Sequence, residues 1–190
     1  MKKLSTLLLA LVLCLLTAAC GQTQPSLTGE YPMELEFSSG AGAWRTLLVL
    51  NADGTFTGRY SDSDMGDAGD AYPNGTLYLS DFSGRFELQP SDNDSVTHLR
   101  LTELVCQTEP GTQEIKDGIL HVYTGPHGFY DYEGSLCPDF FLYPPSTPVT
   151  AAGENLLSWW PGRFEPTQPD TLGAYALENP TAGTAFFSLP

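Results

Sequence analysis

The stretch that decides the fold runs from Gly42 to Phe86 and opens with a hairpin, GAWRTLLVL-NADG-TFTGRY. Within its second strand, Phe56, Gly58 and Tyr60 share one face, as in a half-buried strand. Two such segments joined by an Asp-Gly turn predict an antiparallel β-hairpin. An acidic, glycine-rich loop, SDSDMGDAGDAYPNG, follows, and then comes the strand segment TLYLSDFSGRFEL.

The strand segment over residues 76–88 changes the parity of its apolar positions. Leu77 and Leu79 share one face, whereas Phe82 and Phe86 share a face of the opposite parity. A continuous strand cannot bury both pairs, so we expect a bulge near residues 80–81. Bulges of this kind let a sheet curl into a barrel.

The rest of the chain is punctuated by 19 glycines and 15 prolines. Its alternating segments predict further short strands over residues 31–37, 96–105, 119–123, 139–143, 173–178 and 184–189, with residues 107–116 as a loop. One short helix is expected over residues 154–160, where Pro161 stops it. The predicted class is all-β and antiparallel, as a barrel or, alternatively, a sandwich, with one short C-terminal helix.

The first 19 residues are a targeting segment, with Lys2 and Lys3 before an apolar region too short to span a membrane comfortably. The small residues 17–19 directly before Cys20 resemble the lipobox of bacterial lipoproteins, which implies lipidation of Cys20. The alternative is an ordinary signal peptide cleaved after Ala19. We expect a flexible tether over residues 20–30, one all-β domain over residues 31–190, and a lipid-anchored, extracytoplasmic protein.

The chain left after removal of the signal is strongly acidic. It holds six basic residues against 23 acidic ones, a net charge of −17. Such a surface repels nucleic acid, which excludes a nucleic-acid partner, and it keeps an exposed protein soluble.

Two cysteines remain beyond the signal and the lipidation site, Cys106 and Cys137. An extracytoplasmic compartment permits a disulfide between them, and we expect that pairing. The alternative is a pair of buried free thiols on neighbouring strands.

The acidic loop carries four closely spaced carboxylates, Asp62, Asp64, Asp67 and Asp70. Calcium takes six to eight oxygen ligands, and a glycine-flexible loop could wrap one ion. The spacing departs from the EF-hand, since Asp67 stands where that motif needs glycine. A calcium site is the functional interpretation of this loop, and a solvated surface loop is the simpler one.

A second candidate site is the aromatic stretch around His127, Phe129, Tyr130 and Tyr132, to which Tyr72 of the acidic loop is added as a mouth residue. Rings beside carboxylates suit stacking on sugars or capture of an amphipathic ligand. Alternatively, these rings fill the core and cover one barrel end.

Catalytic motifs are missing from the sequence: it contains no G-x-S-x-G, no H-E-x-x-H and no phosphate-binding loop. A glycosidase-type carboxylate pair cannot be selected among so many acidic residues. The sequence therefore predicts a binding protein and not an enzyme.

Gly42-Ala43-Trp44, followed by the NADGTF turn, resembles the G-x-W start of lipocalin-like (calycin) barrels. That resemblance implies that Trp44 plugs the closed end of an up-and-down barrel and that an arginine packs over it. Arg163 is the basic residue of the C-terminal third, although it precedes the last hairpin. The segments FSSGAGAW, NADGTFTG, DSDMGD and YPNGT also resemble a group of lipoproteins of gut Firmicutes. The expected function is binding of a small apolar or amphipathic ligand at the barrel mouth; the alternative is a surface module for a glycan or a protein.

Overall fold

The computed structural model describes residues 27–40, 42–91 and 95–189. The predicted signal peptide and the predicted lipidation site, Cys20, lie outside these residues. The folded domain begins earlier than the predicted boundary at residue 31. Leu27 is buried in the core, and its amide donates to the carbonyl of Ala52 at 2.8 Å. Leu27, which was predicted to belong to the tether, therefore packs with the domain.

Eight strands form a closed antiparallel barrel in which each strand pairs with the next barrel strand along the chain. Closure comes from β1 pairing with β10, which settles the choice between barrel and sandwich in favour of the barrel. The barrel strands are β1 (Met33–Ser38), β2 (Trp44–Leu50), β3 (Thr55–Asp64), β4 (Thr76–Leu88), β5 (Thr97–Cys106), β8 (Asp139–Tyr143), β9 (Ala176–Asn179) and β10 (Thr184–Ser188).

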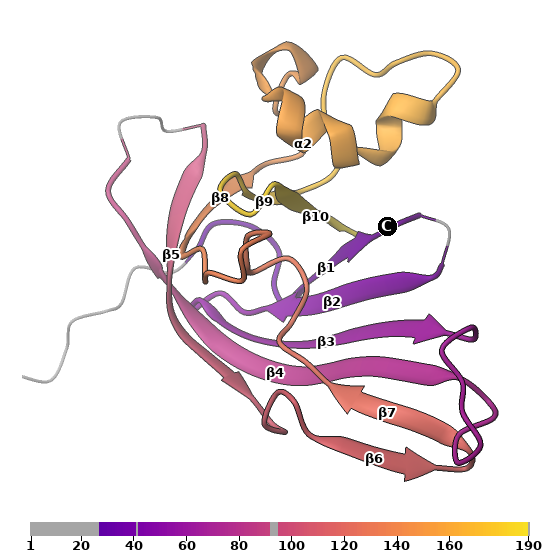
Figure 1. The fold of residues 1–190 in the computed structure, drawn as a ribbon. Helices are drawn as coiled ribbons and strands as arrows, with labels where there is room; N and C mark the ends of the chain where they lie inside the picture. Colours follow the sequence, from indigo (N-terminus) through magenta and orange to yellow (C-terminus); the bar gives the residue numbers. More distant parts are fainter. Residues whose placement is uncertain (1–26, 41, 92–94, 190) are drawn as a thin grey trace, which may run out of the picture.

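A second hairpin branches from the barrel at β4. The first part of β4 pairs in parallel with β7 (Ile119–Tyr123), and its second part pairs with β5. The outer strand of this hairpin is β6 (Gln113–Lys116), which lies in the stretch predicted as a loop. Beyond the barrel, β3, β4, β7 and β6 continue as a flared extension that carries the acidic loop at its tip (Figure 1).

The predicted bulge at residues 80–81 is wrong. The pairing of β3 with β4 is unbroken, and inward positions keep one parity through Thr76, Ser80, Phe82 and Phe86. Leu77 and Leu79 lie on the other face. Polar side chains are tolerated inside because they are bonded: the Thr76 hydroxyl donates to the Asp67 carbonyl at 2.8 Å. The irregularity occurs later in the strand, between Arg85 and Phe86, against β5.

The barrel interior is filled with aromatic and aliphatic side chains. Those that are almost fully buried include Leu35, Phe37, Leu48, Phe56, Phe82, Phe86, Leu99, Phe140, Leu177 and Phe186. They come from strands all around the barrel, so a single core holds the wall together.

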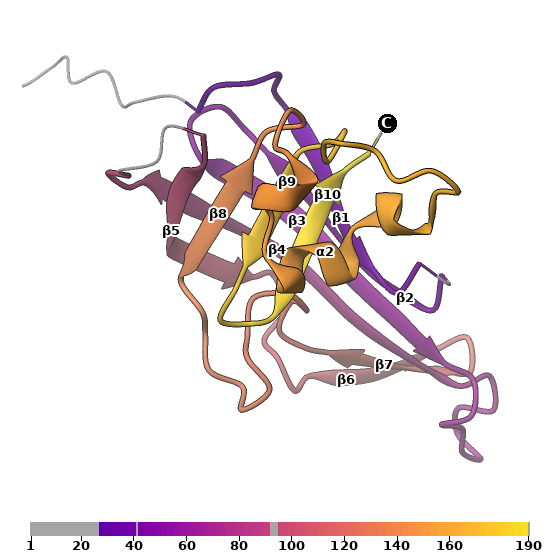
Figure 2. The ribbon, with the colours of Figure 1, turned by 90° about the horizontal axis from the view of Figure 1, so that it is seen from above.

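A second apolar cluster lies outside the barrel wall. It joins Leu156 of the helix α2 (Glu154–Trp159) and Trp160 to the outward side chains of β9 and β10. The helical segment, which includes the short 3₁₀ turns Val149–Ala151 and Pro161–Phe164, lies over these strands (Figure 2). All four residues of β9 are buried because one face meets the core and the other meets this cover.

Candidate functional site

The segment between β7 and β8, residues 124–138, plugs one end of the barrel. The ring of Phe129 is fully buried, and its centroid lies 5.4 to 5.8 Å from those of Phe56, Phe82 and Phe140. These rings come from β3, β4 and β8. Phe129 therefore fills the barrel core, and its ring does not face a ligand.

Buried polar side chains of the wall hold the plug in place. The Thr46 hydroxyl donates to the His127 carbonyl at 2.9 Å, and the Thr184 hydroxyl donates to the Gly128 carbonyl at 3.0 Å. The Asn179 amide donates to a third plug carbonyl, that of residue 137, at 3.0 Å. These bonds satisfy backbone groups that would otherwise be buried without partners.

His127 packs among rings at this plugged end. Its imidazole stacks on Trp44 with centroids 4.7 Å apart and lies near Phe37 and Tyr60. The residue remains exposed to solvent on its outer side. Partial desolvation by the neighbouring rings lowers the pKa of His127, and the nearby Asp62 carboxylate offsets part of that effect. A neutral imidazole is the form that suits this packing, because it loses less hydration.

The remaining aromatic candidates do not join one surface. Tyr130 is half-buried against the core, whereas the Tyr132 side chain is 96% exposed on the loop beyond it. Tyr72 lies on the acidic loop, where its amide bonds to the carbonyl of Gly69. The structure therefore divides the predicted aromatic site into core residues and isolated surface residues.

The acidic loop uses two of its carboxylates to hold its own conformation. Asp64 accepts from the amides of Gly66 and Asp67 at 2.8 and 3.1 Å. The Asp67 carboxylate accepts the Tyr78 hydroxyl at 3.3 Å. Within the described residues, no three histidine, cysteine or acidic side chains are gathered so that they could hold a metal ion. Calcium binding therefore stays a prediction from sequence.

The predicted disulfide is not formed, because Cys106 and Cys137 are both free thiols. Cys106 accepts from the Ser80 hydroxyl at 3.7 Å, while the Cys137 thiol donates to the Ser135 carbonyl at 3.4 Å. Burial raises the pKa of the Cys137 thiol. The two thiols thus each have a local partner within their own part of the fold.

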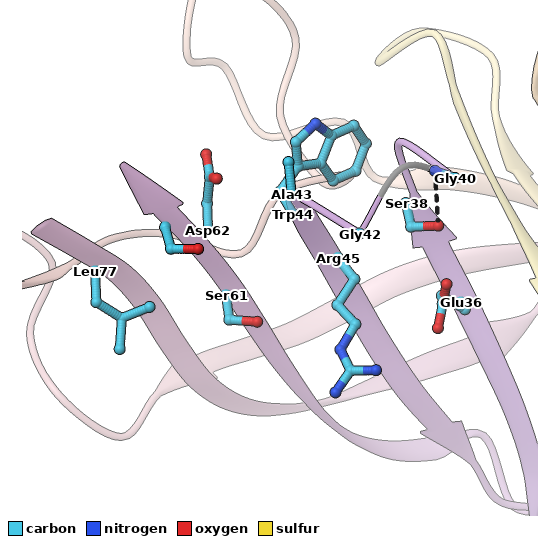
Figure 3. Close-up of a pocket in the computed structure, with 11 residues that line it drawn as sticks. Glu36, Ser38, Gly40, Gly42, Ala43, Trp44, Arg45, Ser61, Asp62 and Leu77 are labelled. Carbon is cyan, nitrogen blue, oxygen red and sulfur yellow. Dashed lines mark hydrogen bonds between the residues drawn. The ribbon is translucent and has the colours of Figure 1, made fainter. Parts of the chain in front are cut away.

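A polar hollow of about 390 Å³ lies where the turn between β1 and β2 meets β3. Arg45 of β2 is paired directly with Ser38 of β1 and with Ser61 of β3. Directly opposed residues of neighbouring strands share one face of the sheet. Figure 3 shows the Arg45 side chain extending between Ser61 and Glu36, away from Trp44.

A larger hollow of about 1050 Å³ lies on the other side of the same turn, between β10 and the helical segment. Its apolar lining includes Trp159, Trp160, Phe164, Leu172, Phe187 and Leu189. The Trp160 indole donates to the Leu172 carbonyl at 3.0 Å, which fixes this floor. Phe164 stands at the rim with 77% of its surface exposed, beneath the Arg163 guanidinium at 4.5 Å.

The two hollows adjoin along β1, because Glu36, Ser38 and Gly40 line both of them. Sequence reasoning missed this surface. The sequence pattern places Glu34 and Glu36 on the outward face of the first strand. It does not show which side chains of other segments lie beside them in the fold. The resemblance implied an arginine over Trp44, and Arg163, the basic residue of the C-terminal third, lies on Phe164 and donates to the Ser158 carbonyl.

The comparisons with known proteins add no relative. No protein-family model, no curated protein and no solved structure matches the chain. Among the described residues, the structure contains no helix with the length and apolar character needed to cross a membrane. The class of the molecule is therefore defined by its own fold: a closed, plugged antiparallel barrel with a hollow on its outer wall.

Proposed function

We propose that this protein is a lipid-tethered, extracytoplasmic binding module for a small amphipathic ligand, and that it binds the ligand on the outer wall of the barrel. The observation that carries the proposal is the hollow of about 1050 Å³ lined by aromatic side chains. Concave, mostly apolar surfaces with a few polar groups are the usual form of small-molecule sites. The barrel interior is not the site in this proposal, because Phe129 and its neighbours occupy it.

The arrangement supports binding rather than catalysis. The hollow offers ring faces, a hydrocarbon floor and a rim with Glu36, Arg163 and Glu165. The Arg163 guanidinium is already engaged by a carbonyl and by a ring, so it shapes the rim. Ring faces of this kind hold the apolar part of a ligand through area burial and dispersion.

The test uses the neutral fluorescent probe N-phenyl-1-naphthylamine and the soluble domain that starts after Cys20. We expect saturable probe binding that the Phe164→Ser variant weakens several-fold. Phe164 is exposed, so its replacement leaves folding stability almost unchanged. The matched control is Tyr132→Ser, which removes an even more exposed ring away from the hollow. Equal probe affinity in both variants would show that the hollow is not the binding site.

A further inference from the structure

The polar hollow contains a cation that has no partner among the residues that the structure describes. Of the six basic residues beyond the signal segment, five are engaged. Carboxylates pair with Arg59, Arg100 and Lys116, and carbonyls accept from Arg85 and Arg163. Within the described part of the chain, Arg45 makes no hydrogen bond and no ion pair. In a chain with 23 acidic residues, the guanidinium of Arg45 is thus without a partner among the described residues, and it lies in a hollow.

Hydroxyl groups stand on both sides of this cation. Ser38 and Ser61 are its direct cross-strand neighbours, and Ser63 lines the same hollow. A guanidinium flanked by hydroxyls offers several donors in one direction, which is the arrangement that binds a phosphate or carboxylate. The head group of a ligand in this hollow therefore includes an anionic part.

A wholly anionic ligand does not fit the surroundings. The net charge of −17 beyond the signal segment repels it at long range. At short range, Glu36 lies on β1 diagonally across from Arg45, at the junction of the two hollows. A carboxylate at that junction attracts an ammonium group. The pair of charges thus complements a head group that carries both signs.

From these observations, and resting on the proposed function, we infer that the ligand is a zwitterionic single-chain amphiphile. Its anionic group binds Arg45, its ammonium group faces Glu36, and its chain lies in the hollow lined by Trp159 and Phe187. The sizes of the hollows favour a long chain, because the apolar part is much larger than the polar part. A free amino acid with an apolar side chain would leave most of the apolar hollow unfilled.

The test titrates the soluble domain calorimetrically with dodecyl-N,N-dimethylglycine below its critical micelle concentration, because its ammonium group lies between the chain and the carboxylate, as Glu36 lies between the large hollow and Arg45. We expect Arg45→Met to weaken binding about tenfold, because a charge-assisted contact is lost. Dodecyltrimethylammonium, which has the ammonium but no anionic group, should bind Arg45→Met as it binds the wild type. Glu36→Gln should weaken both ligands, since both carry the cation.

Two controls and one neutral ligand make the outcome decisive. Arg100→Met and Glu34→Gln remove like charges that do not line either hollow, and neither should change the titrations. Dodecyl maltoside has the same chain and an uncharged head, so its affinity should not depend on Arg45 or Glu36. An equal loss of affinity for all three ligands in Arg45→Met, or no loss of affinity for dodecyl-N,N-dimethylglycine, would overturn the head-group inference. Probe binding by N-phenyl-1-naphthylamine would then still stand, whereas its absence would refute the apolar site itself.

Discussion

At the scale of single residues, the packing of the plug inside the barrel depends on a glycine, Gly128. Gly128 has a φ of 103°, a conformation that side-chain-bearing residues rarely adopt. A Cβ atom at this position would lie 2.6 Å from the ring of Phe186 and 3.2 Å from that of Phe37. The glycine is therefore required twice, once by backbone geometry and once by the close approach of core rings.

This requirement gives the first prediction. Gly128→Ala should lower the free energy of unfolding by about 3 kcal/mol, through strain and overpacking together. Gly134→Ala is the matched control, because Gly134 also has a positive φ, 83°, but a Cβ atom added to it would meet no other atom within 4 Å. It should cost about 1 kcal/mol. Denaturant unfolding measures both, and equal losses would disprove the role of the ring contacts.

The second prediction concerns the plug ring. Phe129→Ala should destabilise the protein by about 3 to 5 kcal/mol, because it opens a cavity among the rings of the barrel core. Tyr132→Ala, three residues further on, should change stability by less than about 0.5 kcal/mol, because that ring is exposed. A small loss for Phe129→Ala would mean that the plug is not part of the core.

At the scale of elements, the sequence predicted where the strands lie better than it predicted which side chains meet inside the barrel. The β4, β7 and β8 bounds match the expected ones, and the hairpins β2–β3 and β9–β10 are confirmed, because alternation and turn residues are local signals. The strand β6 was missed, since its four residues QEIK show a single apolar side chain. For the aromatic stretch, the alternative interpretation, that its rings fill the core, is the one that holds for Phe129. The sequence could not decide this, because whether such a ring packs in the core depends on contacts with distant strands.

The candidate site was harder to predict than the fold for the same reason. Arg45 and Ser61 are 16 positions apart, and the helical cover lies many residues further along the chain than either. The larger hollow forms only when the barrel has closed and α2 has packed on β10. Compositional signals such as the four aspartates of the acidic loop are conspicuous in sequence, yet the structure uses them largely to shape the loop itself.

The third prediction belongs to the helical cover. Leu156 is fully buried in the cluster outside the barrel, so Leu156→Ala should weaken that packing by about 2 to 5 kcal/mol. The barrel core is a separate cluster, so we expect the loss to open the cover locally. Hydrogen exchange should show faster exchange over residues 149–173 with β2 and β3 unchanged. Uniform acceleration in all strands would show that cover and barrel unfold as one unit.

At the scale of the whole molecule, one buried and one half-buried phenol make the stability depend on pH in the alkaline range. Burial, with smaller contributions from neighbouring charges, raises the pKa of Tyr31 and of Tyr60 to about 12, against an ordinary value of 10.0. Between pH 10 and pH 12 the folded protein keeps these protons, whereas the unfolded chain releases them. The unfolded state binds fewer protons in this range, so the free energy of unfolding falls as the pH rises.

The fourth prediction follows from that sign. The stability contribution of the Tyr60 phenol should be complete below pH 10 and should be lost between pH 10 and pH 12. Tyr60→Phe should make the decline shallower, by at most about 1.4 kcal/mol per pH unit. Urea unfolding at pH 8, 10 and 11 measures the slope. An identical slope in wild type and variant would exclude Tyr60 as a contributor.

The hydrogen bond between Leu27 and Ala52 also limits how the proposed lipidated protein stands on its membrane. Six residues lie between Cys20 and Leu27, and the seven steps from one Cα atom to the other reach at most about 25 Å. With Cys20 lipidated as proposed, a connection of this length would keep the barrel end that carries the turn at residues 51–54 near the bilayer. Arg45 lies six positions before this turn, near the opposite end of β2 and about 20 Å from the turn. The two hollows would thus open toward the medium, where the module would capture dissolved amphiphile molecules instead of extracting them from the bilayer beneath it.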